Sequence, residues 1–131
     1  MADFGFPKEL RLLNAGDFEA VFSKNQYKVA NRHFLILAMP SQQHSSRLGM
    51  VVAKKHIAKA VERNRVKRLI RETFRHTPAM QAALDQIVLV RKGADKLTNQ
   101  ELSNTLKSLW SDLQAKQRRH LTDSQDRKLR P

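Results

Sequence analysis

Residues 60–75 read AVERNRVKRLIRETFR, a segment with six basic and two acidic side chains. Helical periodicity of about 100° per residue separates this segment into two sides. The apolar side spans roughly 140° and consists of Val66, Leu69, Ile70 and Phe74. The opposite side spans about 60° and consists of Asn64, Arg68, Arg71 and Arg75, flanked by Arg65 and Lys67. The segment therefore predicts a helix that packs on a core by one side and presents guanidinium groups by the other.

The charge on this helix is too one-sided for an ordinary solvated face. Residues 54–76 carry nine basic and two acidic side chains. Exposed helix faces usually mix signs, because like charges at i, i+3 and i+4 repel by a few tenths of a kcal/mol per pair. Arg outnumbers Lys within the helix, and the planar guanidinium fork suits phosphate. Polyanion binding is favoured over the solvated-face alternative, with Lys54, Lys55 and Lys59 extending the basic surface.

The whole chain has the same bias. It has 131 residues, a net charge of +13 and no cysteine. One domain fits this length, and the charge favours nucleic acid as partner over an anionic membrane. The absence of cysteine excludes disulfides and thiolate zinc sites. The N-terminus lacks the pattern of a signal peptide, and the run FLILAMP (34–40) is too short to span a bilayer. We expect a cytoplasmic protein that does not bind membranes.

Catalytic patterns are missing from the sequence. The histidines lack metal-binding spacing and are scattered through the chain: His33, His44, His56, His76 and His120. No two carboxylates are placed for acid–base work. We predict no catalytic residue and no metal site in this chain.

The remaining elements indicate a mixed fold. A short helix is expected over residues 14–24, with Asn14 or Asp17 as cap and Phe18, Val21 and Phe22 on one face. Runs rich in β-formers at residues 26–40, 47–55 and 85–92 predict strands, the first run being long enough for two. Residues 97–117 predict a closing helix, with a Thr98–Glu101 capping box and a stripe of Leu102, Leu106, Leu109 and Leu113.

This order of elements, α-β-β-β-α-β-α, predicts an α+β domain built as a two-layer α/β sandwich. We assign residues 1–117 to a single RNA-binding domain. Residues 118–131 are basic and contain little to bury, which predicts a disordered tail.

The sequence also resembles a known family. VVAKKHIAKAVERNRVKRLIRETFR (51–75) is similar to the signature of the bacterial ribonuclease P protein subunit, in which A-V-x-R-N-R-x-K-R follows a lysine pair. DFEAVFSK (17–24), VANRHFLILA (29–38), IVLVRKGA (87–94) and LKSLW (106–110) fall where that family has its other elements. The resemblance covers roughly residues 8–115.

The resemblance implies a fold and a function. The fold is that of the second domain of a small-subunit ribosomal protein, with a left-handed βαβ crossover where the general rule favours a right-handed one. The partners implied are a large catalytic RNA and precursor tRNA, whose 5′ leader the holoenzyme removes. In the family, catalysis belongs to the RNA and its bound Mg²⁺, so we expect the protein by itself to bind no cofactor. We also expect no obligate protein partner.

The resemblance also implies site residues. Those expected on the catalytic RNA are Lys54, Lys55, Arg63, Asn64, Arg65, Lys67, Arg68, Arg71 and Arg75. Those expected in a cleft for the single-stranded leader are Phe18, Phe22, Lys28, Arg32 and Phe34. Plain core packing is an equal alternative for Phe18 and Phe22. For the whole chain, the alternatives are a general or ribosomal-type RNA-binding protein and an autonomous nuclease.

Overall fold

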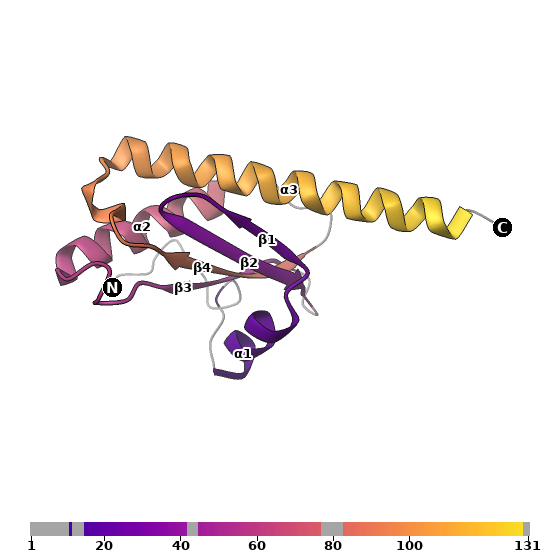
Figure 1. Cartoon of the computed structure of the whole chain (residues 1–131), viewed down its shortest axis with the longest axis horizontal. Coiled ribbons are helices and arrows are strands. Elements are labelled where there is room, and N and C mark those ends of the chain that lie inside the picture. Colours follow the sequence, from indigo (N-terminus) through magenta and orange to yellow (C-terminus); the bar gives the residue numbers. More distant parts are fainter. Residues whose placement is uncertain (1–10, 12–14, 42–44, 77–82, 130–131) are drawn as a thin grey trace.

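The computed structural model describes residues 11, 15–41, 45–76 and 83–129, with side chains described as far as His120. The elements, in chain order, are α1 (Ala15–Lys24), β1 (Tyr27–Ala30), β2 (Phe34–Pro40), β3 (Arg47–Val51), α2 (Ala60–His76), β4 (Leu84–Val90), the short 3₁₀ helix η2 (Ala94–Lys96) and α3 (Asn99–Leu129). The predicted α+β class is confirmed (Figure 1).

The strands form one four-stranded sheet in the order β1-β2-β4-β3. β2 runs antiparallel to both of its neighbours, whereas β3 and β4 are parallel. Adjacent parallel strands need a crossover connection, because a tight turn would reverse the chain. The basic helix α2 is that crossover. Its left hand, implied by the resemblance, stays a prediction.

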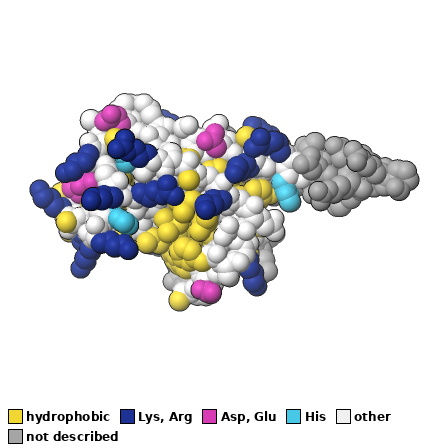
Figure 2. Space-filling view, viewed as in Figure 1, with side chains coloured by type: hydrophobic (Ala, Val, Ile, Leu, Met, Phe, Trp, Pro, Cys, Tyr) yellow, Lys and Arg dark blue, Asp and Glu magenta, His cyan; other side chains and the backbone are white. Residues whose placement is uncertain are grey.

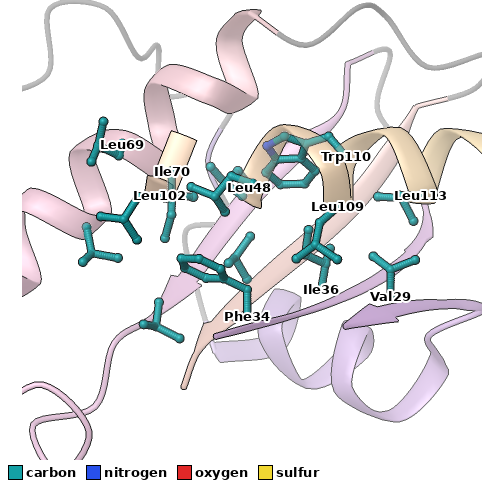
Figure 3. Close-up of a cluster of buried hydrophobic side chains, with 14 of the residues drawn as sticks. Val29, Phe34, Ile36, Leu48, Leu69, Ile70, Leu102, Leu109, Trp110 and Leu113 are labelled. Atoms are coloured by element: carbon teal, nitrogen blue, oxygen red, sulfur yellow. The ribbon is translucent and has the colours of Figure 1, made fainter. Parts of the chain in front are cut away.

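The main core lies between the sheet and the helices α2 and α3 (Figure 3). From the sheet, Phe34, Ile36 and Val88 are buried there. The α2 stripe is confirmed: Val66, Leu69 and Ile70 are buried, and Phe74 packs partly buried against them. The predicted leucine stripe of α3 is buried as well, and it consists of Leu102, Leu106, Leu109 and Leu113. Helix periodicity therefore predicted correctly which sides of α2 and α3 face the sheet.

Helix α1 covers part of the opposite face of the sheet. Val21 is buried there against Leu37 and Ile87, while Phe18 packs partly buried at the border. Phe22, one turn further along, is 42% exposed. The second face is therefore only partly closed, because a ten-residue helix spans only about 15 Å.

An ion pair that the sequence did not reveal joins these elements. Arg47 and Asp85 lie opposite each other on β3 and β4 and form a two-point contact, with N–O distances of 2.9 and 2.8 Å. The hydrogen bond to Asp85 raises the pKa of Arg47. Asp17, in the first turn of α1, lies 3.6 Å from the same guanidinium group. The parallel strand pair and α1 are thus tied by one side chain.

Helix α3 starts as predicted and ends later than predicted. The Thr98 N–H donates to Glu101 Oε1 at 2.9 Å, and the Glu101 N–H donates to Thr98 Oγ1 at 3.1 Å. The first of these bonds lowers the pKa of Glu101. The disordered tail predicted from residue 118 is replaced by helix, since α3 continues to Leu129. No Gly or Pro interrupts residues 99–129, and the ring of His120 contacts Tyr27 edge-on, with centroids 5.6 Å apart.

Gln86 on β4 provides a test of the main core. Its side chain is 1% exposed, and neither its Oε1 nor its Nε2 has a hydrogen-bond partner among the described residues. An unsatisfied buried polar group costs about 1–3 kcal/mol. Gln86→Met keeps the chain length and removes both polar atoms, so we expect it to raise the free energy of unfolding, measured by urea denaturation, by about 1 kcal/mol or more.

Gln100→Met is the matched control, because Gln100 is exposed on α3 and bonds to Asn104. It should change stability by no more than about 0.5 kcal/mol. A destabilised Gln86→Met protein would contradict the prediction.

Candidate nucleic-acid interface

The first candidate surface is the outer side of α2, which we call the basic helix face. It consists of Asn64, Lys67, Arg68, Arg71 and Arg75. Asn64, Arg68 and Arg75 are exposed, and Lys67 and Arg71 are half-buried. Among the described residues, no hydrogen bond or ion pair holds the Arg68 guanidinium. Lys54 and Lys55, exposed in the turn after β3, continue this charge toward the sheet.

Arg65 was predicted to contact RNA, but its guanidinium is engaged inside the protein. It donates to Glu62 Oε2 at 3.0 and 2.8 Å, to the Asp95 carbonyl at 3.0 Å and to Asn99 Oδ1 at 2.8 Å. These bonds attach α2 to η2 and to the start of α3. The sequence could not reveal them, because Asp95 and Asn99 lie about thirty residues further along the chain.

Arg63 also has internal partners. Its guanidinium donates to the carbonyls of Ile57 and Ala58 at 3.0 and 2.8 Å. Ile57 itself is fully buried. Arg63 therefore fastens the segment that leads into α2, whereas Asn64 between the two arginines is exposed. The R-N-R sequence thus alternates inward, outward and inward.

The second candidate surface is the part of the sheet that α1 leaves open. A row of apolar side chains crosses all four strands there, because Ala30 pairs with Leu35, Leu35 with Leu89, and Leu89 with Val51. We call these four residues the apolar row. Ala30 is exposed and the other three are half-buried. Three strand spacings give the row a length of about 14 Å. Figure 2 shows a hydrophobic patch on this side of the molecule with Lys and Arg side chains around it.

Cations border the apolar row along one side, where β1, β3 and β4 end. β3 and β4 are parallel, so their carboxyl ends lie at the same edge of the sheet and bring Lys54 and Lys55 near Arg91 and Lys92. Arg91 also donates to the Asn31 carbonyl at 2.8 Å, which brings in the β1–β2 turn and its exposed Arg32. Arg91 and Lys92 are exposed and were not predicted as site residues. The sequence feature that could have identified them is that this basic pair directly follows the buried strand β4.

The five residues expected in the leader cleft are only partly brought together. Phe18 and Phe22 lie on α1 beside the open sheet face, and Lys28 points to that face from β1, opposite Leu37. Phe34 does not join them. It is fully buried in the main core, in phase with Ile36 on the other face of the sheet. Strand alternation explains this correction, because residues two apart share a face.

Within the described ranges, no group of three His, Asp or Glu residues could hold a metal ion. His44 lies outside those ranges. The described helices also lack an apolar stretch of the length that a membrane crossing needs.

Comparisons with known proteins agree with the sequence resemblance. The sequence model of the family described as Ribonuclease P matches residues 6–114. The ribonuclease P protein component of Chromohalobacter salexigens is 44% identical over 114 residues, which cover 87% of this chain and 89% of that protein. Among solved structures, the RNase P protein of Staphylococcus aureus has a TM-score of 0.71 and 33% identity, covering 78% of this chain and 93% of that one. That of Thermotoga maritima has a TM-score of 0.61 and 31% identity, covering 75% and 96%.

The two arginine environments on α2 predict different effects on stability. Arg65→Ala removes four hydrogen bonds and leaves Glu62 unpaired, so we expect it to lower the free energy of unfolding by about 1–3 kcal/mol. Arg68→Ala removes an exposed charge from a like-charged column and should leave stability within about 0.5 kcal/mol. Thermal unfolding of the free protein measures both. Equal melting temperatures for the two variants would contradict an internal role for Arg65.

Proposed function

Because this chain belongs to the ribonuclease P protein family, we propose that it is the protein subunit of a cytoplasmic ribonuclease P. In this proposal it binds a catalytic RNA and the 5′ leader of precursor tRNA, and it assists endonucleolytic removal of the leader. The observation that carries the proposal is the pair of surfaces on opposite sides of the sheet. One is a cationic helix face and the other is an apolar row with a cationic border.

The basic helix face suits the catalytic RNA. Its cations lie along one helix and continue into Lys54 and Lys55, a pattern that follows a phosphate backbone rather than reading base edges. Arg68 supports this reading most directly, because it is exposed and no described residue neutralises it. Phosphates there would relieve the repulsion within the column. Arg63 and Arg65 contribute by holding the helix in place.

The open sheet face suits an unpaired leader. Single strands are bound without sequence readout by aromatic platforms next to positive charge. Phe22 offers such a platform, because 42% of its side chain is exposed and it lies on the helix that borders the open face. Lys28, Arg32, Arg91 and Lys92 supply the charge. Phe18, half-buried against Val21, contributes mainly to packing.

The chemistry is assigned to the RNA. Mg²⁺ bound by the RNA would activate the attacking water and stabilise the leaving oxygen. No step of this proposal uses a metal or a catalytic side chain of the protein. The protein's contribution is to bind the leader and to place it next to the RNA.

Cleavage assays with purified components test this proposal. Precursor tRNA is incubated with the protein alone, with the catalytic RNA alone and with both, at low Mg²⁺ concentration. We expect no cleavage by the protein alone and faster cleavage by both components than by the RNA alone. Cleavage by rigorously purified protein would indicate an autonomous nuclease. A protein that binds unrelated RNAs equally well and does not assist the catalytic RNA would be a general RNA-binding protein.

Substitutions on the two surfaces should weaken the binding of different RNAs. Arg68→Gln should weaken binding to the catalytic RNA and reduce the slope of log affinity against log salt by about 0.7–0.9, the value for one phosphate contact. Phe22→Leu keeps much of the volume and removes the aromatic face. It should weaken holoenzyme binding to precursor tRNA by roughly 5- to 150-fold, the value of one stacked base.

Mature tRNA is the control ligand for Phe22→Leu, because it has no leader and should be bound as before. Both variants should melt like the parent protein. If Phe22→Leu weakens binding of precursor and mature tRNA equally, the open sheet face does not contact the leader. If the salt slope of Arg68→Gln is unchanged, the basic helix face is an ordinary solvated surface.

A further inference from the structure

Helix α3 extends beyond the residues that the family model matches. The family match ends at residue 114, whereas α3 continues to Leu129. Figure 1 shows the helix running along β1 and on past the sheet. The segment 115–120, which starts this extension, carries three basic residues and no acidic residue.

The beginning of the extension is held on the sheet by one side of the helix. Leu113 and Gln117 are buried, and His120 contacts the ring of Tyr27 on β1. These positions follow i, i+4, i+7 spacing and therefore share one side of the helix. The neighbouring side has the same spacing and consists of Asp112, Lys116 and Arg119, which are exposed. This second side is consequently fixed in position over the outer edge of β1.

A pocket of about 400 Å³ lies between this second side and β1. Its lining residues are Lys28, Val29, Ala30, Asp112, Ala115, Lys116 and Arg119. Three of them are cations and one is an acid. β1 is an edge strand, and its outer side presents backbone groups to the pocket: Lys116 Nζ donates to the Lys28 carbonyl at 2.6 Å.

Two of the three cations remain available to a ligand. In the described part of the chain, no hydrogen bond or ion pair engages the Lys28 ammonium or the Arg119 guanidinium. Lys116 uses one of its three donors on the Lys28 carbonyl and keeps two. Asp112 is not within ion-pair distance of Lys116 or Arg119. The pocket therefore has an excess of unused donors and of positive charge, which suits an oxyanion.

The pocket is continuous with the apolar row. Ala30 belongs to both, and Lys28 points to the same face of the sheet as Ala30 while lining the pocket. A strand that lies along the apolar row from Val51 toward Ala30 therefore reaches the pocket as it passes β1. Arg91 and Lys92 follow β4 at the edge of the sheet and do not line the pocket, so the pocket is a separate anion site at the outer edge of β1.

We propose that the pocket between β1 and the α3 extension binds a backbone phosphate of the single-stranded leader, beyond the nucleotides that cover the apolar row. This assignment rests on the proposed function for the identity of the strand. Arg119 and Lys116 contact the phosphate, and Asp112 weakens its binding by like charge. The site lengthens the leader-binding surface beyond the apolar row, so it acts only on precursors whose leaders reach β1.

Holoenzyme binding to two precursors tests the pocket, one with a single-nucleotide leader and one with a long leader. Arg119→Gln should weaken binding of the long-leader precursor by roughly 2- to 5-fold, the range for an exposed charge contact. The salt slope should fall by about 0.7. Asp112→Asn should strengthen long-leader binding. Neither variant should alter binding of the short-leader precursor.

Arg118→Gln is the matched control, because Arg118 is the exposed neighbour of Arg119 and does not line the pocket. It should leave long-leader affinity unchanged. Equal losses for Arg118→Gln and Arg119→Gln would overturn the proposal in favour of general helix charge. If Arg119→Gln lowers the affinity for the short-leader and long-leader precursors equally, the proposal is overturned in favour of a contact with the catalytic RNA.

Amide NMR of the full-length free protein supplies a readout that does not depend on cleavage. A single-stranded oligoribonucleotide should shift the amide signals of Lys28, Ala30 and Arg119 in the parent protein, and Arg119→Gln should weaken this response. Inorganic phosphate alone should shift them little. A full response to inorganic phosphate would overturn the RNA assignment in favour of a small-anion site. If the holoenzyme cleaves no precursor, the proposed function is refuted. The NMR titration of the free protein would still test whether the pocket binds single-stranded RNA.

Discussion

The parallel pairing of β3 with β4 is the constraint on which the rest of the structure depends. Adjacent parallel strands require a connection that crosses one face of the sheet, and α2 is that connection. A crossover helix must bury one side against the sheet. Val66, Leu69 and Ile70 form that side. The opposite side, with Asn64, Arg68 and Arg75, therefore faces solvent. Strand pairing thereby orients the charge of the chain.

The positive charge on α2 is tolerated partly because two of its arginines form hydrogen bonds within the protein. Arg65 connects Glu62, Asp95 and Asn99, and Arg63 binds the carbonyls of the preceding segment. These bonds convert two of the repelling groups into attachments between α2, η2 and α3. The remaining cations are exposed or half-buried, so a single sequence motif supplies both structural support and a cationic surface.

Helix length decides how the two faces of the sheet are used. α2 and α3 have 17 and 31 residues and close one face over a continuous core. α1 has ten residues and covers the other face incompletely, which leaves the apolar row half-buried. Sites that hold unpaired nucleotides combine aromatic platforms with positive charge, and the exposed ring of Phe22 lies on the helix beside this row. The unusually long α3 adds a cationic pocket at the β1 edge of the same surface.

The sequence by itself determined the features that depend on near neighbours along the chain. Helix periodicity identified the buried sides of α2 and α3, the Thr98–Glu101 pair located the start of α3, and composition indicated a polyanionic partner. Only the tertiary structure decided that Phe34 faces the core, that Arg65 bonds to Asp95 and Asn99, and that Arg91 bonds to the Asn31 carbonyl. The structure also continues α3 past residue 117, where the contact between His120 and Tyr27 joins residues ninety-three positions apart in the sequence. Strand register and long-range packing set these features, and local propensity contains no information about either.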